Sequence, residues 1–288
     1  MNFNYIEDKA ELRSYLKNFE DSKQYIMALD IEAESNLHAY GEKLCLIQVF
    51  DGINKIIIDP FKIDNYDLKL LFENRNFLKV MYDASGDLSL LKNANNIDIK
   101  SILDLRPAVE LLNYDKQDLH SVIASELGVL LENKKKYQRN NWTLRPISEQ
   151  ALDYATNDVI YLLRLKDILL RKLYESKLLD SFLLKNLRIQ NKDHTRNPEH
   201  RYRNIKGYNS LQSEEKALFR QVVDIREKYA KACNMPAHNV INRTDLFNIT
   251  KDAKHINEIS FPKKFSTALI DHILHDLRMV IEEERCHQ

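Results

Sequence analysis

Two acidic residues stand two positions apart at the end of a short apolar run. The run Tyr25–Asp30 (YIMALD) is typical of a buried strand, and alternation along a strand puts Asp30 and Glu32 on one face. Carboxylates held this close repel each other, which raises a pKa unless a cation neutralises them. A hard divalent cation such as Mg²⁺, which prefers oxygen ligands, suits such a pair. Taken alone, the pattern describes a solvated strand end equally well.

A phenol and a third carboxylate lie four residues apart in the helical stretch Ser148–Leu163 (SEQALDYATNDVIYLL). Residues at this spacing share one helix face, so Tyr154 and Asp158 can combine a metal ligand with a hydroxyl that orients water. The alternative is a tyrosine packed in the core beside a surface acid.

A fourth acid, Asp87, opens a predicted helix after the strand-like run in YDASGDLSLL (82–91). By itself, an acid in a first helical turn is only a favourable partner for the helix dipole. Asp87 therefore becomes a candidate metal ligand only in combination with the other three acids.

Strands and helices alternate around these residues. Asp51-Gly52 is a hairpin signal between two apolar runs. Helical periodicity dominates after the last predicted strand as far as Gln190, with an interruption at the polar stretch Lys134–Trp142. The pattern predicts a mixed α/β domain. The predicted strands are Tyr25–Asp30, Lys43–Phe50, Lys55–Pro60, 77–84 and Ile102–Leu105.

A second, all-helical module is predicted at the C-terminal end. Residues 191–210 hold a proline, a glycine and several asparagines but few aliphatic residues, which is typical of a linker. Beyond it, one helix is expected from an N-cap at Ser213 to Pro236, and others at Thr244–Thr250 and Phe265–Glu284. We therefore expect domains at 1–190 and 211–288, joined by the linker 191–210.

Composition points to a cytoplasmic protein that does not act at a membrane. The 288 residues include 43 basic and 43 acidic ones, so any affinity for nucleic acid must come from local patches. No stretch approaches the roughly 20 apolar residues of a membrane span, and the N-terminus lacks the apolar core of a signal peptide. Three scattered cysteines, Cys45, Cys233 and Cys286, suit a reducing compartment and form no zinc pattern.

Taken together, the acidic motifs resemble the three exonuclease motifs of the DEDD superfamily, in its tyrosine-containing branch. The match extends beyond the acids and resembles the ribonuclease D family over about residues 5–190. The C-terminal module, with IKGYNSL and NMPAHNV, resembles an HRDC domain more weakly. The matching segments are ALDIEAESNLHAYGEKLCLIQVFDG (28–52), VMYDASGDLSLLK (80–92), ILDLRPAVELL (102–112) and KYQRNNWTLRPISEQALDYATNDVIYLL (136–163).

The resemblance implies a ribonuclease H-like fold and hydrolysis of phosphodiester bonds by two divalent metal ions, Mg²⁺ or Mn²⁺. Asp30 would bridge both ions, Glu32 and Asp158 would complete the site of the first, and Asp87 would serve the second. Tyr154 would orient the attacking water. The implied function is a 3′–5′ exoribonuclease that acts on single-stranded RNA 3′ ends, including tRNA precursors and other stable RNAs. We expect it to be a monomer.

A basic stretch with aromatic residues precedes the Tyr154 helix and is the candidate RNA contact, because single strands are held by basic groups on phosphates and by stacking on bases. A solvated basic loop is the alternative. A second basic run in the linker, 201–206, is read as solvated. The predicted RNA contacts are Lys135, Gln138, Arg139, Trp142 and Arg145.

Two residues depart from the family pattern: Tyr82 stands where the family often has His, and Asn141 where it usually has Asp. Neither position supplies a metal carboxylate, so activity is expected to survive. A DNA 3′–5′ exonuclease would share the same acids and remains an alternative, although the HRDC-like module favours RNA. A non-catalytic nucleic-acid-binding scaffold is disfavoured because no acid is missing.

Overall fold

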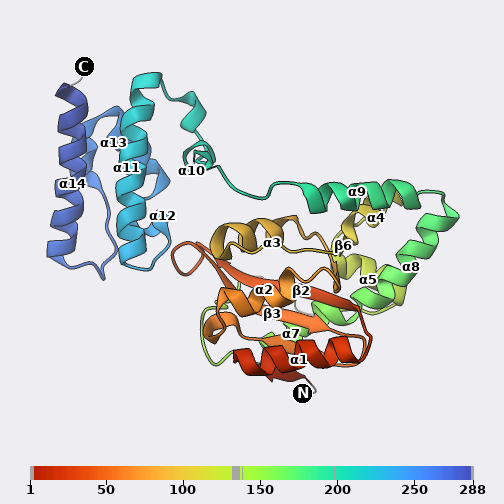
Figure 1. The fold of residues 1–288 in the computed structure, drawn as a ribbon. Helices are drawn as coiled ribbons and strands as arrows, with labels where there is room; N and C mark the ends of the chain where they lie inside the picture. Colours follow the sequence, from red (N-terminus) through yellow and green to blue (C-terminus); the bar gives the residue numbers. More distant parts are fainter. Residues whose placement is uncertain (1–2, 132–136, 138, 198, 287–288) are drawn as a thin grey trace. The chain divides into compact units, whose positions relative to one another are not determined.

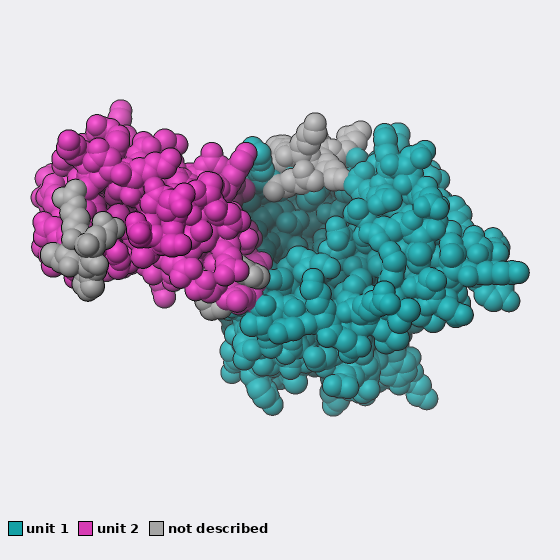
Figure 2. Space-filling view, turned by 90° about the horizontal axis from the view of Figure 1, so that it is seen from above, with its two compact units in different colours: residues 1–34, 43–195 teal, residues 35–42, 196–288 magenta. Residues whose placement is uncertain are grey.

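The computed structural model describes residues 3–131, 137, 139–197 and 199–286 of the chain. The chain forms two compact units (teal and magenta in Figure 2). Unit 1 comprises Met1–Glu34 and Lys43–Thr195, and unit 2 comprises Ser35–Glu42 and Arg196–Gln288. Each unit has a hydrophobic core of its own.

Unit 1 is built on a six-stranded mixed sheet with the order β1-β4-β3-β2-β5-β6 (Figure 1). β1 pairs in parallel with β4, and β5 pairs in parallel with both β2 and β6, whereas β3 and β4 are antiparallel. The mixed sheet confirms the predicted fold class. The strands are β1 (Asn4–Ile6), β2 (Ile26–Ser35), β3 (Glu42–Phe50), β4 (Lys55–Ile58), β5 (Leu78–Met81) and β6 (Ile102–Asp104).

Helices pack on both faces of this sheet, and β2 distributes its side chains between them. Met27, Leu29 and Ile31 join one core with α1, α2 and α3, while Ala28 joins another with α4, α5, α7, α8 and α9. This alternation follows from the two-residue period of a strand. The helices of unit 1 are α1 (Lys9–Asp21), α2 (Asn65–Phe72), α3 (Ser85–Leu90), α4 (Arg106–Leu111), α5 (Leu119–Leu127), α7 (Glu149–Ile160), α8 (Leu162–Glu175) and α9 (Leu179–Asn191). Short 3₁₀ or π turns lie at Pro60–Lys62 and Leu91–Asn95.

The first strand and helix were not predicted from the sequence, although α1 has clear local signals. The Asp8 carboxylate accepts hydrogen bonds from the backbone N–H groups of Ala10 and Glu11, at 2.8 and 3.0 Å, and so caps the helix. Leu12, Leu16 and Phe19 are buried at helical spacing. β1 has only three residues, too few for a hydrophobic period to stand out.

Among the described residues, unit 2 is helical, with α11 packed against α12, α13 and α14. The α11 helix begins at Ser213, one residue earlier than predicted, because Gln212 and not Ser213 is the N-cap. The Gln212 N–H donates to the Glu215 carboxylate at 2.8 Å. The helices are α10 (His200–Arg203), α11 (Ser213–Ala232), α12 (Ala237–Val240), α13 (Arg243–Lys251) and α14 (Thr267–Cys286), with 3₁₀ turns at Tyr208–Ser210 and Ala253–Glu258.

The boundary between the units falls at Thr195 and Arg196, inside the predicted linker 191–210. Much of that segment is folded, because Tyr202 and Tyr208 are buried in the core of unit 2. Their apolar rings replace the aliphatic residues whose scarcity suggested a linker. The connection between β2 and β3 also belongs to unit 2, which the sequence did not indicate. No helix in the described part of the chain has both the length and the apolar character that crossing a membrane requires.

Candidate active site

Asp30 and Glu32 project from the same face of β2 as Ala28, whose methyl group packs in the core that contains Val159 of α7. Both carboxylates are partly buried. Burial raises the pKa of Asp30 well above its usual value, and the charges of Asp87, Asp158 and Glu32 raise it further. Burial, followed by the charges of Asp158 and Asp87, likewise raises the pKa of Glu32. Three elements distant in sequence therefore bring the four predicted acids close enough to interact.

Asp87 lies in the first turn of α3, directly after β5. Burial raises its pKa to about 7, with further contributions from the charges of Asp104 and Asp83. Asp87 therefore faces a negative environment, and the favourable helix dipole alone does not account for its position.

Tyr154 and Asp158 lie one turn apart on α7, which the Ser148 hydroxyl caps by accepting from the N–H of Ala151 at 3.3 Å. Burial raises the pKa of Tyr154 above its usual value, and the negative charges of Asp158, Glu32 and Asp30 add to the shift. The phenol therefore keeps its proton at neutral pH. It can donate a hydrogen bond but cannot serve as a base.

A cavity of about 140 Å³ lies beside Asp30, Tyr154 and Asp158. His120, from the first turn of α5, lies in its wall, with Nε2 2.8 Å from Oδ1 of Asp158 and its ring 6.3 Å from that of Tyr154. His120 was not predicted from the sequence, because a single histidine after the helix cap Asp118 has no distinctive spacing. The lining residues are Asp30, Tyr82, Leu119, His120, Tyr154, Asp158 and Leu162.

The charge and chemistry of this cluster fit divalent metal ions. Among the described residues, no cationic group contributes to the raised pKa of Glu32 or of Asp87, so a bound cation would relieve the repulsion at these carboxylates. All four acids offer the oxygen ligands that Mg²⁺ and Mn²⁺ prefer. Within the described ranges, no three His, Cys, Asp or Glu side chains are already arranged to hold an ion.

A family model described as 3′–5′ exonuclease matches residues 3–174, which include all four acids and Tyr154. The chain belongs to this 3′–5′ exonuclease family. Its relatives confirm the resemblance to ribonuclease D. The chain is 32% identical over 216 residues to ribonuclease D of Desulfotalea psychrophila, an alignment that covers 73% of this chain and 57% of that protein.

Ribonuclease D and NrnC are among the solved structures of similar fold. Ribonuclease D of Escherichia coli superposes with a TM-score of 0.76 at 23% identity, over 99% of this chain and 76% of that one. NrnC of Brucella melitensis, solved with bound Mg²⁺, matches with a TM-score of 0.54 at 21% identity, over 66% of this chain and 90% of that one. These likenesses support the exonuclease fold of unit 1.

Two of the predicted RNA contacts have structural roles within unit 1 instead. Trp142 is 2% exposed and packs with residues of β3, β4 and α7, so its ring is unavailable for stacking on a base. Arg145 pairs with Asp59 through Nε and Nη2, at 2.5 and 3.0 Å, and donates to the carbonyls of Cys45, Trp142 and Leu144. The positive charge of Arg145, which suggested phosphate binding, is thus paired with a carboxylate of unit 1.

The remaining RNA contacts stay predictions. Arg139 is exposed and available to a phosphate. Lys135 and Gln138 lie outside the described residues.

The two departures from the family pattern have distinct structural roles. The Tyr82 ring lines the cavity, while its hydroxyl donates to the Gln117 carbonyl. Asn141 forms a turn, because its side-chain oxygen accepts from the N–H and hydroxyl of Thr143 at 3.1 and 2.6 Å. Neither residue offers a carboxylate to an ion, in agreement with the sequence analysis.

Proposed function

We propose that the chain is a 3′–5′ exoribonuclease that releases nucleotides from RNA 3′ ends with the help of two divalent metal ions. The observation that carries this proposal is the cluster of four mutually repelling carboxylates beside a protonated tyrosine. Its membership of the 3′–5′ exonuclease family supports the polarity, and the relative named ribonuclease D supports RNA as the substrate.

In this proposal, Asp30 would be shared by both ions, Glu32 and Asp158 would complete the site of one, and Asp87 would serve the other. When bound, the ions would supply activation of water and positive charge against the phosphate. The Mg²⁺ present in NrnC supports Mg²⁺ as the ion, and Mn²⁺ is the alternative. The charges of all three other acids raise the pKa of Asp30, which supports a place for it among them.

The side chains of this site have separate tasks. The protonated Tyr154 hydroxyl orients the attacking water by hydrogen bonding, since a phenol with a raised pKa cannot abstract a proton near neutral pH. His120 fixes the Asp158 carboxylate through their 2.8 Å contact. Leu119 and Leu162 give the cavity apolar walls that limit the access of bulk water.

Unit 2 is proposed to be an HRDC-like module that strengthens RNA binding. Its residues 196–288 include 16 lysine and arginine residues against 13 aspartate and glutamate residues, which favours contact with phosphates. Precursors of tRNA and other stable RNAs are the proposed substrates. We propose that the enzyme works as a monomer in the cytoplasm, where the free thiols of Cys45 and Cys233 would stay reduced.

The deciding experiment uses single-stranded RNA and DNA of the same sequence, labelled at the 5′ end. We expect a ladder of RNA shortened from the 3′ end with Mg²⁺ or Mn²⁺, and no products with EDTA. Faster degradation of the DNA would replace the proposal with a DNA 3′–5′ exonuclease. Binding without hydrolysis of either strand would indicate a scaffold.

A further inference from the structure

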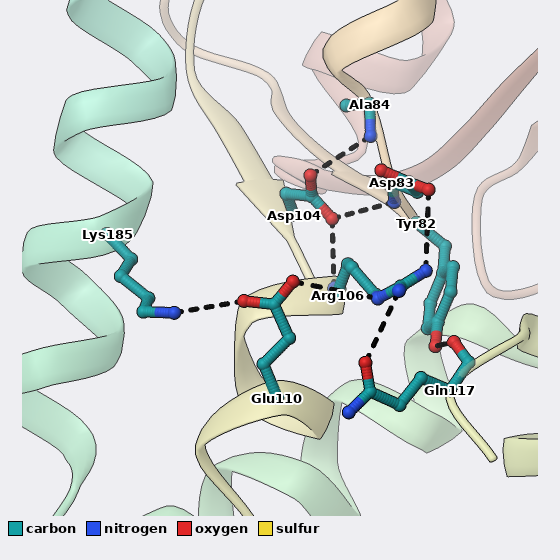
Figure 3. Close-up of polar contacts among 8 residues, drawn as sticks. All are labelled: Tyr82, Asp83, Ala84, Asp104, Arg106, Glu110, Gln117 and Lys185. Carbon is teal, nitrogen blue, oxygen red and sulfur yellow. Dashed lines mark hydrogen bonds and ion pairs between the residues drawn. The ribbon is translucent and has the colours of Figure 1, made fainter. Parts of the chain in front are cut away.

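A buried carboxylate outside the metal-ligand set connects β6 to the turn that precedes Asp87 (Figure 3). Asp104 is 2% exposed and ends β6. Its Oδ1 accepts from the backbone N–H of Asp83 at 2.8 Å, and its Oδ2 accepts from that of Ala84 at 3.0 Å. Its Oδ1 also accepts from the N–H of Arg106 at 2.9 Å.

The Asp104 carboxylate holds the turn ahead of α3, whose own N-cap residue, Ala84, has no side chain that could accept a hydrogen bond. Asp83 in this turn adopts a left-handed φ of 60°, a conformation that few non-glycine residues adopt, although aspartate adopts it more readily than most. Asp104 fixes it from the neighbouring strand, and Asp87 follows three residues after Ala84.

Asp104 is itself held from the side opposite the turn. Its own N–H donates to Oδ1 of Asn186 on α9 at 2.7 Å, and its carbonyl accepts from Nδ2 of Asn186 at 3.2 Å. These contacts fix the backbone of Asp104, from which its carboxylate extends toward the turn. The negative charge of Asp104 also reaches Asp87, where it raises the pKa of that carboxyl.

We propose that Asp104 is a positioning residue that sets Asp87 for metal binding. It does so by fixing the turn that precedes α3 through two backbone hydrogen bonds, to the N–H groups of Asp83 and Ala84. The inference rests on the proposed metal-dependent function. Replacing a residue that orients a metal ligand without contacting the ion itself typically lowers metal affinity or activity by about 10- to 100-fold.

The substitution Asp104→Asn tests this role, because it keeps the side-chain shape but removes the charge and one of the two acceptor oxygens. Whichever way the amide turns, at least one of the three N–H groups loses its acceptor. The matched control is Asp67→Asn. The Asp67 carboxylate is also buried, and it pairs with Arg13 on α1 at 2.5 Å instead of contacting α3.

Two measurements on the full-length protein distinguish positioning from general destabilisation. The first is Mn²⁺ affinity by calorimetry without RNA, together with the Mn²⁺ concentration that gives half-maximal RNA hydrolysis. For Asp104→Asn we expect both to weaken by about 10- to 100-fold, and Asp67→Asn should leave both unchanged. The second is hydrogen exchange in the wild type, where the amides of Asp83 and Ala84 should be strongly protected.

Unchanged Mn²⁺ affinity in folded Asp104→Asn would overturn the proposal, as would exchange of the two amides at the rate of exposed ones. If Asp104→Asn does not fold, Asn186→Ala replaces it, and a smaller weakening of Mn²⁺ binding is expected. A wild type that binds Mn²⁺ but cleaves no nucleic acid would refute the proposed function. The calorimetry would then still decide the role of Asp104.

Discussion

At the scale of single residues, the site is defined by the negative charge of buried carboxylates that repel one another. Burial and mutual repulsion raise the pKa values of Asp30, Glu32 and Asp87. A raised folded-state pKa means that the ionised carboxyl destabilises the fold. For Asp87, this destabilisation is absent below about pH 4 and grows as the pH rises toward about 7. Bound cations should reverse it.

Asp30→Asn is expected to abolish hydrolysis, because a neutral amide cannot supply the charge that two cations need. It should also raise the thermal midpoint in EDTA at pH 7, since it removes one of the repelling charges. Affinity for RNA in EDTA should stay close to the wild type. Turnover near the wild-type rate with added metal would refute the assignment of Asp30 as the bridging ligand.

Tyr154→Phe should lower turnover by about 10²- to 10⁴-fold, the usual contribution of a group that positions or transfers a proton. Only the hydroxyl is lost, and the ring can still pack 5.1 Å from that of Tyr137, so the stability of α7 should persist. The measurement is turnover at saturating RNA, with circular dichroism as the control for folding. A full rate would mean that Tyr154 serves only in packing.

At the scale of elements, the site depends on braces between segments far apart in sequence. Arg145 joins the segment before α7 to β3 and to the turn after β4. Asp104 joins β6 to the start of α3. The Arg106 side chain contacts Asp83 and Gln117, at 3.4 and 3.3 Å, and so joins the same turn to the segment before α5 (Figure 3). The segments that lead into α3, α5 and α7 are thus each fixed by a polar contact from another part of unit 1.

Arg145→Lys should reduce the free energy of unfolding by about 1–3 kcal/mol, because lysine cannot pair with Asp59 through two nitrogens and also reach the Cys45 carbonyl. RNA affinity and its salt dependence, measured in EDTA, should not change. Arg139→Ala is the contrasting variant, expected to weaken RNA binding without loss of stability. Weaker RNA binding by folded Arg145→Lys would restore its predicted RNA contact, because lysine keeps the charge but not the paired hydrogen bonds of arginine.

At the scale of the whole molecule, unit 2 includes a segment inserted between two strands of the catalytic sheet. Residues 35–42 belong to unit 2, where Tyr40 packs against its core. Burial and a hydrogen bond to Glu227 raise the pKa of the Tyr40 hydroxyl. The strand that bears Asp30 and Glu32 therefore leads directly into a segment that folds with unit 2.

Removal of residues 196–288 should leave the metal ligands in place but weaken RNA binding and flatten its dependence on salt, because basic residues are lost. The fragment 1–195 should also aggregate, since Tyr40 loses its packing partners. Adding Tyr40→Ser to the fragment should restore solubility, as measured by light scattering. Unchanged RNA affinity and salt slope would assign unit 2 a task other than RNA binding. Equal solubility of both fragments would show that Tyr40 does not depend on unit 2.

The four acids and Tyr154 were predicted from the combination of their motifs and its resemblance to a known family. Strand and helix periods showed which side chains share a face, but each motif taken alone also fitted a structural role. Local pattern predicted the mixed sheet, because the apolar run of a strand and the residues of a turn each extend over only a few positions. These predictions needed no knowledge of how the elements pack.

Only the tertiary structure decided which residues meet across the chain. His120 reaches Asp158 because α5 packs beside α7, and a lone histidine in the sequence gives no sign of this. Arg145 appeared to be a free cation because its partner Asp59 lies 86 positions away. Periodicity describes one element at a time, whereas burial and pairing depend on contacts between elements. The roles of Arg145, Asp104 and the segment 35–42 therefore emerged only from the fold.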